Sequence, residues 1–155
     1  MYGIHLLGEL YGCPADEPLL TQADALRDLC RRAVDDAGLT IVGDRFFQFE
    51  PQGVTGTVLL AESHLAIHTW PEAGFVTLDV YVCNYTTDNT GKAERVFKAL
   101  EAALKPARKR FQAIHRGAAE VIGDARDVLG DAPRDVIGDA PRKLTDDEPR
   151  RIAAG

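Results

Sequence analysis

Residues 75–83 alternate between apolar and polar side chains, and this pattern limits the possible folds more than any other in the chain. Val76, Leu78, Val80 and Val82 occupy one set of positions, and Thr77, Asp79, Tyr81 and Cys83 occupy the other. Successive side chains of a β-strand point to opposite faces of the sheet, so the first set is predicted to face a core. The second set is expected to line a site or an interface.

Strand patterns outnumber helix patterns in the first 117 residues. Two segments carry apolar residues at the spacing of an amphipathic helix: 21–37, with Thr21 as N-cap and Gly38 as stop, and 92–104, which Pro106 ends. Short apolar or alternating runs between turn residues predict strands. The expected strands are 2–11, 54–61, 64–69, 75–83 and 108–115. Residues 39–42 and 45–49 are expected to form one extended region with a bend at Gly43-Asp44, which pairs with 54–61 across a short turn.

The order of these elements is strand, helix, several strands, helix, strand. Because the helices do not alternate with the strands one for one, the order favours an α+β fold. We expect a two-layer α/β sandwich, with a mainly antiparallel sheet and two helices on one face. The opposite face of the sheet is then bare. With Trp70 and Tyr81 available for it, we expect this face to form the interface of a homodimer.

Residues 121–143 contain three copies of a unit of seven to eight residues, which begin at Val121, Val128 and Val136. The period is far shorter than that of solenoid repeats. Glycine, proline and alternating charge disfavour a regular helix or strand. We therefore expect one folded domain at residues 1–120 and a disordered tail at residues 121–155. Docking of the apolar pair of each copy into a partner groove is the alternative.

The charge balance and the cysteines narrow the class of protein. The 18 basic residues against 24 acidic ones give a net charge of −6 without a basic patch, so we expect no nucleic-acid partner. A cationic or neutral small substrate suits this charge better than an anionic polymer. Cys13, Cys30 and Cys83 are widely spaced, which indicates a reducing compartment, and the first two resemble small buried hydrophobic residues. Without a leader pattern or a long apolar run, we expect a cytoplasmic protein that does not enter a membrane.

The thirteen residues from Leu60 to Glu72 hold a serine, two histidines, two glutamates and the only tryptophan, in a region that otherwise resembles buried strand. Buried polar groups without partners cost about 1 to 3 kcal/mol each. The cluster is therefore either satisfied structurally or kept for chemistry. Taken singly, Glu62 and Glu72 fit solvated loop positions, and His5 and His115 fit structural roles.

Two common kinds of site fit the cluster poorly. A triad of Ser63, His68 and Asp79 lacks the Gly-x-Ser-x-Gly turn, and a strand follows the serine where a helix would be needed. His64 and His68 are four positions apart as in a zinc-binding helix, but in a strand this spacing separates them by about 13 Å. We therefore expect neither a hydrolase triad nor a metal site.

One known family resembles the chain over residues 2–117. The resemblance lies in the run Gly-Val-Thr-Gly-Thr-Val-Leu-Leu-Ala-Glu-Ser-His-Leu-Ala-Ile-His-Thr-Trp-Pro-Glu at 53–72 and in Asp-Val-Tyr-Val-Cys at 79–83. This pattern is similar to that of the prokaryotic S-adenosylmethionine decarboxylases, which are pyruvoyl enzymes of polyamine synthesis. The string Glu-Ser-His followed by His-Thr-Trp-Pro-Glu is specific to the family.

The resemblance implies a proenzyme that cuts itself between Glu62 and Ser63, leaving a pyruvoyl group made from Ser63. His68 matches the histidine that moves protons during processing. Thr55 matches a hydroxyl that assists processing, and Cys83 matches the thiol that returns a proton to the substrate. The pyruvoyl group forms a Schiff base with the substrate amine and acts as the electron sink, so neither pyridoxal phosphate nor a metal is expected. From the strand positions, we expect Ser63, Thr55 and Cys83 to share one site.

For substrate binding, the resemblance implies Phe49, Phe47 and Glu72. The aromatic rings would lie against the adenine and the sulfonium, and Glu72 would meet polar groups of the ligand. The chain departs from the family pattern at three positions: Pro14, Phe47 and Asn84. These departures leave open a pyruvoyl decarboxylase of arginine or ornithine on the same fold. A separate alternative is a non-processing regulatory homologue.

Overall fold

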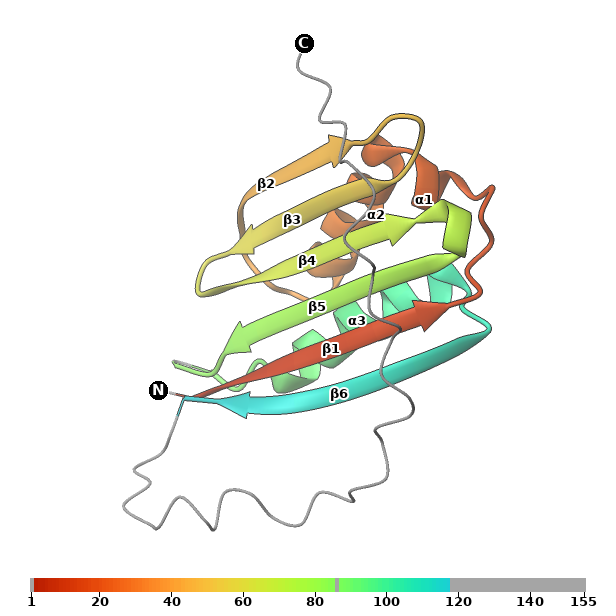
Figure 1. Ribbon diagram of the computed structural model, residues 1–155. Helices are drawn as coiled ribbons and strands as arrows, with labels where there is room; N and C mark the ends of the chain where they lie inside the picture. Colours follow the sequence, from red (N-terminus) through yellow and green to blue (C-terminus); the bar gives the residue numbers. More distant parts are fainter. Residues whose placement is uncertain (1, 86, 118–155) are drawn as a thin grey trace, which may run out of the picture. The chain divides into compact units, whose positions relative to one another are not determined.

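The computed structural model describes residues 2–85 and 87–117. Six strands form one sheet in the order β2-β3-β4-β5-β1-β6, with every neighbouring pair antiparallel (Figure 1). The strands are β1 (Gly3–Tyr11), β2 (Ile41–Gln48), β3 (Val54–Leu60), β4 (Ser63–Trp70), β5 (Phe75–Cys83) and β6 (Arg108–Arg116). The repeat tail predicted at 121–155 lies outside the described residues.

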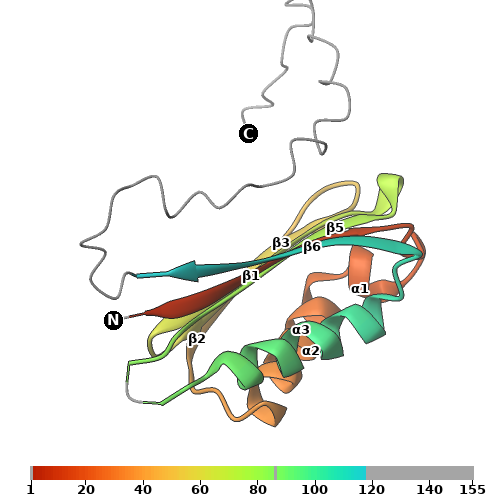
Figure 2. The same ribbon diagram turned by 90° about the horizontal axis from the view of Figure 1, so that it is seen from below.

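Helices cover one face of the sheet, and in the described part of the chain none lies on the other (Figure 2). The helices α2 (Ala23–Asp36) and α3 (Thr90–Leu104) correspond to the two that the sequence predicted. A third helix, α1 (Pro18–Thr21), is a single turn that was not predicted. The arrangement confirms the α+β class and the two-layer sandwich. We call the helix-covered side of the sheet the inner face and the opposite side the outer face.

The predicted start of the first long helix is wrong, because the chain breaks at Gln22. This residue has an extended backbone (φ −126°, ψ 119°), so Thr21 ends α1 and does not cap α2. The backbone N–H of Ala23 donates a hydrogen bond to Oε1 of Gln48 at 2.8 Å. A side chain from β2 thus satisfies one of the N–H groups that a helix start leaves free.

The predicted bend at Gly43-Asp44 is also wrong, since β2 continues through it. A register irregularity between Ile41 and Gly43 accommodates the extra residue. The Asp44 carboxylate accepts hydrogen bonds from two arginines of α2, Arg27 at 2.5 Å and Arg31. These ion pairs tie the strand to the helix over a segment whose residues favour a turn.

The core lies between the inner face and the helices. Val76, Leu78, Val80 and Val82 are each at most 1% exposed, which confirms the alternation in β5. Cys13 and Cys30 are buried, as predicted. Burial raises the pKa of the Cys30 thiol to about 12. This thiol is therefore protonated and unreactive at neutral pH.

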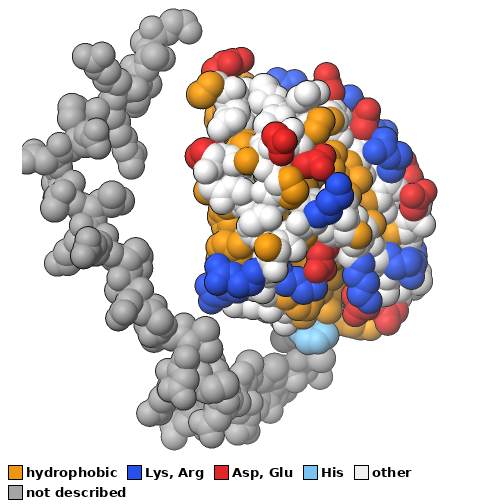
Figure 3. Space-filling view, turned by 90° about the vertical axis from the view of Figure 1, so that its right-hand side faces the viewer, with side chains coloured by type: hydrophobic (Ala, Val, Ile, Leu, Met, Phe, Trp, Pro, Cys, Tyr) orange, Lys and Arg blue, Asp and Glu red, His pale blue; other side chains and the backbone are white. Residues whose placement is uncertain are grey.

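The outer face exposes large apolar side chains on three adjacent strands. Phe47, Leu59 and Trp70 are 53%, 48% and 40% exposed. By contrast, the side of the molecule shown in Figure 3 mixes lysine and arginine with aspartate and glutamate. Exposed apolar groups on a sheet face are typical of an interaction surface. The outer face is thus the surface that most resembles an interface.

Candidate active site

The predicted cleavage site lies at the tip of the β3–β4 hairpin. Leu60 pairs with Ser63, so Ala61 and Glu62 alone form the turn, and both are exposed. The backbone N–H of Ala61 donates to the carbonyl of Thr40 at 3.0 Å, which anchors the turn to the segment before β2. Neither turn residue has positive φ, although two-residue hairpin turns usually require it. The Glu62–Ser63 peptide bond is therefore accessible, in a turn that lacks the preferred geometry.

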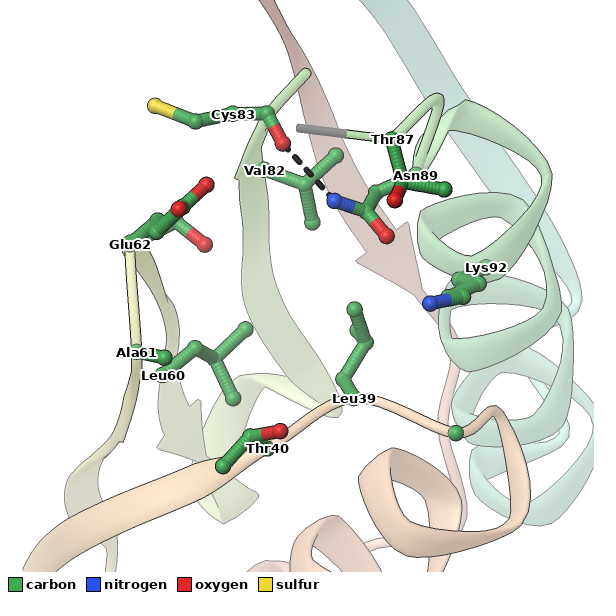
Figure 4. A pocket seen from close by; sticks show the side chains of 12 residues that line it. Leu39, Thr40, Leu60, Ala61, Glu62, Val82, Cys83, Thr87, Asn89 and Lys92 are labelled. Carbon is green, nitrogen blue, oxygen red and sulfur yellow. Dashed lines mark hydrogen bonds between the residues drawn. The ribbon is translucent and has the colours of Figure 1, made fainter. Parts of the chain in front are cut away.

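A pocket of about 200 Å³ opens beside this turn (Figure 4). We call it the turn pocket. Glu62 and Ser63 line it together with Cys83, the last residue of β5. Its other lining residues are Gly38, Leu39, Thr40, Leu60, Ala61, Val82, Thr87, Asn89 and Lys92. The predicted nucleophile and the predicted proton donor thus share one pocket.

Cys83 is held through both its side chain and its backbone. Its thiol donates a hydrogen bond to the Tyr81 hydroxyl at 3.5 Å, and its carbonyl accepts one from the Asn89 amide at 2.9 Å (dashed in Figure 4). Asn84 accepts from the backbone N–H of Asn89 at 2.8 Å and donates to Thr90 at 3.1 Å. Asn84, a departure from the family pattern, therefore joins the end of β5 to the start of α3 and holds Asn89 beside Cys83. The local sequence gave no signal for Asn89, since its partners come from the fold of this loop.

Thr55 and His68 form a second group on the outer face. They are paired residues of β3 and β4, and the Thr55 hydroxyl lies 2.6 Å from Nδ1 of His68 in a hydrogen bond. The two predicted processing residues are therefore direct neighbours. Such a partner fixes the orientation of an imidazole ring.

A pocket of about 300 Å³ adjoins this pair, and we call it the aromatic pocket. Phe49 and Glu72, two of the predicted substrate-binding residues, line it beside Trp70. The other lining residues are Gln52, Gly53, Val54, Thr55, His68 and Thr69. Phe47 does not line the pocket, but its ring packs edge-on against Phe49 with 5.1 Å between ring centroids.

The structure separates the two groups within one chain. Ser63 and His68 are five positions apart in β4, which corresponds to about 16 Å along a strand. Ser63 pairs with the buried Leu60 on the inner face, whereas His68 pairs with Thr55 on the outer face. The expected single site that includes Ser63 and Thr55 is thus not formed inside one protomer, because an odd separation in a strand reverses the face.

The rings of Tyr81, His5 and His64 are neighbours on the outer face, beside Cys83. Tyr81 pairs with His5 of β1 on one side and with His64 of β4 on the other. Burial lowers the pKa of His5, against an opposing effect of Asp79. Among the described residues, Nε2 of His5 is the only buried side-chain nitrogen or oxygen without a hydrogen-bond partner. The outer face therefore carries buried polar groups as well as apolar ones.

The described residues contain neither a metal site nor a membrane-spanning helix. No group of three or more histidine, cysteine, aspartate or glutamate side chains there is placed to hold a metal ion. No helix in the same part of the chain has the length and apolar character needed to span a membrane.

The fold and these two pockets define an α+β protein with a serine at an accessible hairpin tip and a cysteine on the wall of the same pocket. Comparison with known proteins gives the family. The family model described as S-adenosylmethionine decarboxylase matches residues 4–117. The chain therefore belongs to the S-adenosylmethionine decarboxylase family.

Individual relatives agree with this assignment. The chain is 44% identical over 115 residues to the S-adenosylmethionine decarboxylase proenzyme of Archaeoglobus fulgidus, covering 74% of this chain and 97% of the relative. It is 42% identical over 118 residues to the proenzyme of the same name from Aquifex aeolicus, covering 76% and 83%. The crystal structure of the Aquifex aeolicus adenosylmethionine decarboxylase superposes with a TM-score of 0.69 at 40% identity, covering 79% of this chain and 96% of that one.

Proposed function

We propose that this chain is a self-processing, pyruvoyl-dependent decarboxylase. It converts S-adenosylmethionine to carbon dioxide and decarboxylated S-adenosylmethionine, the aminopropyl donor of spermidine synthesis. The observation that carries the proposal is the accessible Glu62–Ser63 bond on the same pocket as Cys83, in a chain of this family. The cysteines, none of which forms a disulfide, support a cytoplasmic location.

Processing starts from Ser63. Its hydroxyl attacks the carbonyl of Glu62 and converts the amide to an ester. Elimination then breaks the ester C–O bond, leaves a carboxylate on Glu62, and yields a dehydroalanine that takes up water and releases ammonia to become the pyruvoyl group. The hairpin tip suits the formation of a pyruvoyl group at residue 63, because a cut in the exposed turn leaves the paired residues of β3 and β4 in place.

The pyruvoyl group supplies a ketone that binds the substrate amine and accepts electrons as carbon dioxide leaves. Cys83, on the wall of the same pocket, gives its thiol proton to the carbon that has lost carbon dioxide. In processing, His68 transfers protons and Thr55 holds its ring.

The aromatic pocket takes the adenosyl end of the substrate. Phe49 and Trp70 provide ring faces, and Glu72 provides an acceptor for the ribose hydroxyls. A sulfonium over an aromatic face is favourable by about 0.5 to 2 kcal/mol. Phe47 supports the Phe49 ring from outside the pocket.

The protein acts as a homodimer whose outer faces pack together. The turn pocket and the aromatic pocket lie at opposite ends of β4. A twofold axis near the middle of that strand brings the turn pocket of one protomer to the aromatic pocket of its partner. Cys83 is 8% exposed, and the alternation along β5 places it on the outer face, which is the face that forms the proposed interface.

Two measurements test the function. Denaturing mass spectrometry of the purified protein should show one chain of residues 1–62 and one that starts with a pyruvoyl group at 63; a single intact mass under active conditions favours a non-processing homologue. Carbon dioxide release is then measured in parallel from S-adenosylmethionine, arginine and ornithine. Turnover of arginine or ornithine alone would show that the substrate is that amino acid and not S-adenosylmethionine.

A further inference from the structure

Tyr81 is the residue that contacts the Cys83 thiol. Both are in β5, two positions apart, so both belong to the outer face. The thiol donates its hydrogen bond to the Tyr81 hydroxyl across 3.5 Å. This is an ordinary distance for a bond to sulfur. The sequence analysis placed Tyr81 in the polar set of β5 and on the expected dimer face, and it made no connection between Tyr81 and the thiol.

The Tyr81 ring is fixed by neighbours from three other strands. The rings of His5 and His64 lie 5.6 Å and 5.7 Å from it between centroids, and the guanidinium of Arg116 lies 4.8 Å above it. Arg116 comes from β6, and the two histidines come from β1 and β4. A ring held on several sides has little rotational freedom, so the hydroxyl keeps its place beside the thiol.

The hydroxyl is suited to both protonation states of the thiol. The hydrogen bond with Cys83 raises the pKa of Tyr81 above its ordinary value near 10, so the phenol stays protonated at neutral pH. A neutral hydroxyl accepts a bond from S–H and, after rotation about its C–O bond, donates one to S⁻. The bond that the hydroxyl donates to S⁻ is stronger than the one it accepts from S–H, because one of its partners is charged.

We propose that Tyr81 is a positioning residue for Cys83 in the decarboxylation. The inference rests on the proposed function, in which Cys83 is the proton donor. When the S–H bond breaks, its proton forms the new C–H bond at the substrate carbon and its electron pair stays on sulfur. The Tyr81 O–H then turns to the thiolate and stabilises it until water returns the proton. Before that step the same hydroxyl holds the thiol in one direction.

The decisive variant is Tyr81→Phe, which keeps the ring and its contacts with His5, His64 and Arg116 and removes only the oxygen. Tyr11→Phe is a matched control. Tyr11 is also an outer-face tyrosine with a guanidinium over its ring, that of Arg108 at 4.7 Å, and its hydroxyl bonds to Glu9 at 2.7 Å, away from Cys83. A loss common to both variants would show a general packing effect and overturn the assignment.

The first readout needs no turnover. Alkylation of Cys83 by iodoacetamide at pH 7 is followed by peptide mass spectrometry in the full chain, with and without Ser63→Ala. Loss of a hydrogen bond to the thiolate predicts alkylation about tenfold slower in Tyr81→Phe and unchanged in Tyr11→Phe. An equal or faster rate in Tyr81→Phe overturns the proposal. Because this readout works in uncleaved protein, it remains decisive if self-processing or decarboxylation is not observed.

The second readout uses the processed enzyme. Tyr81→Phe should lower kcat about tenfold with KM within about twofold, because the bond acts after substrate binding. Normal cleavage at 62–63 in the same variant is expected, since Tyr81 has no part in processing. A rise in KM at constant kcat would assign Tyr81 to substrate binding and contradict a positioning role.

Discussion

Ser63 and His68 belong to the same strand, yet they lie on opposite faces of the sheet, at opposite ends of β4. No side-chain movement within one chain closes a separation of about 16 Å. If His68 serves the cleavage of Glu62–Ser63, it does so in the partner protomer.

This relationship predicts complementation between two inactive variants. Ser63→Ala and His68→Ala should each fail to cleave when expressed alone. In mixed dimers, the His68→Ala chain keeps its own Ser63 and receives His68 from the Ser63→Ala chain, so it should be cut. Co-expression with two different affinity tags, followed by denaturing mass spectrometry of the mixed dimers, measures this. A mixture in which neither chain is cut, beside a wild-type protein that is, contradicts the shared site.

The bond between Thr55 and His68 predicts a slower processing rate in Thr55→Val, which keeps the shape of the side chain and removes the hydroxyl. A hydrogen bond of about 1 to 1.4 kcal/mol corresponds to a rate lower by about five- to tenfold. Thr57→Val is the matched control, because Thr57 lies on the same face of β3 and bonds only to the backbone carbonyl of Leu65 at 2.9 Å. Cleavage of freshly synthesised chains is followed over time on denaturing gels. Equal rates in the two variants would remove Thr55 from processing.

Gly56 leaves room for the ring of Phe46, with which it pairs between β2 and β3. A Cβ atom built on it would lie 2.2 Å from a ring carbon of Phe46, far inside van der Waals contact. We expect Gly56→Ala to lower the free energy of unfolding by about 1 to 3 kcal/mol. Gly43→Ala, in the neighbouring strand, has its nearest contact at 3.8 Å and should cost clearly less. Urea denaturation of both variants, each in the Ser63→Ala background, gives the comparison, and equal losses would show that the Phe46 ring moves aside freely.

Asp44 makes the stability of the domain depend on pH. Its hydrogen bonds with Arg27, and then with Arg31, hold the pKa of the carboxyl below its ordinary value. A group with a lowered native pKa stabilises the fold above its unfolded pKa near 4, and this contribution is lost as the pH falls through the native value. Asp44→Asn should therefore be less stable than the wild type at pH 7. The difference should be about 1 kcal/mol or less, because both arginine side chains are exposed to solvent.

The same comparison at pH 3 and below should show a shrinking difference between the two proteins. Thermal unfolding at each pH measures it. A difference that stays constant from pH 7 to pH 2 would mean that Asp44 acts through packing and not through its charge.

Regular local patterns predicted most of the fold. The alternation of Val76, Leu78 and Val80 placed β5 correctly, and the helical spacing in 92–104 placed α3, because each pattern records burial on one face of a single element. The predictions failed where distant residues decide the structure. Gln48 reaches across to the start of α2, and the arginines of α2 hold Asp44 in a strand.

The sequence by itself determined which side chains are available for chemistry, and it did so in a run of residues that carries the family signature. Only the tertiary structure decided how they are divided: Ser63 with Cys83 on the turn pocket, Thr55 with His68 on the outer face, and Tyr81 beside the thiol. The physical reason is that spacing along a chain fixes the face within one strand, whereas contacts between strands depend on register. That register is set by the two-residue turn at Ala61-Glu62 and by packing of the whole sheet.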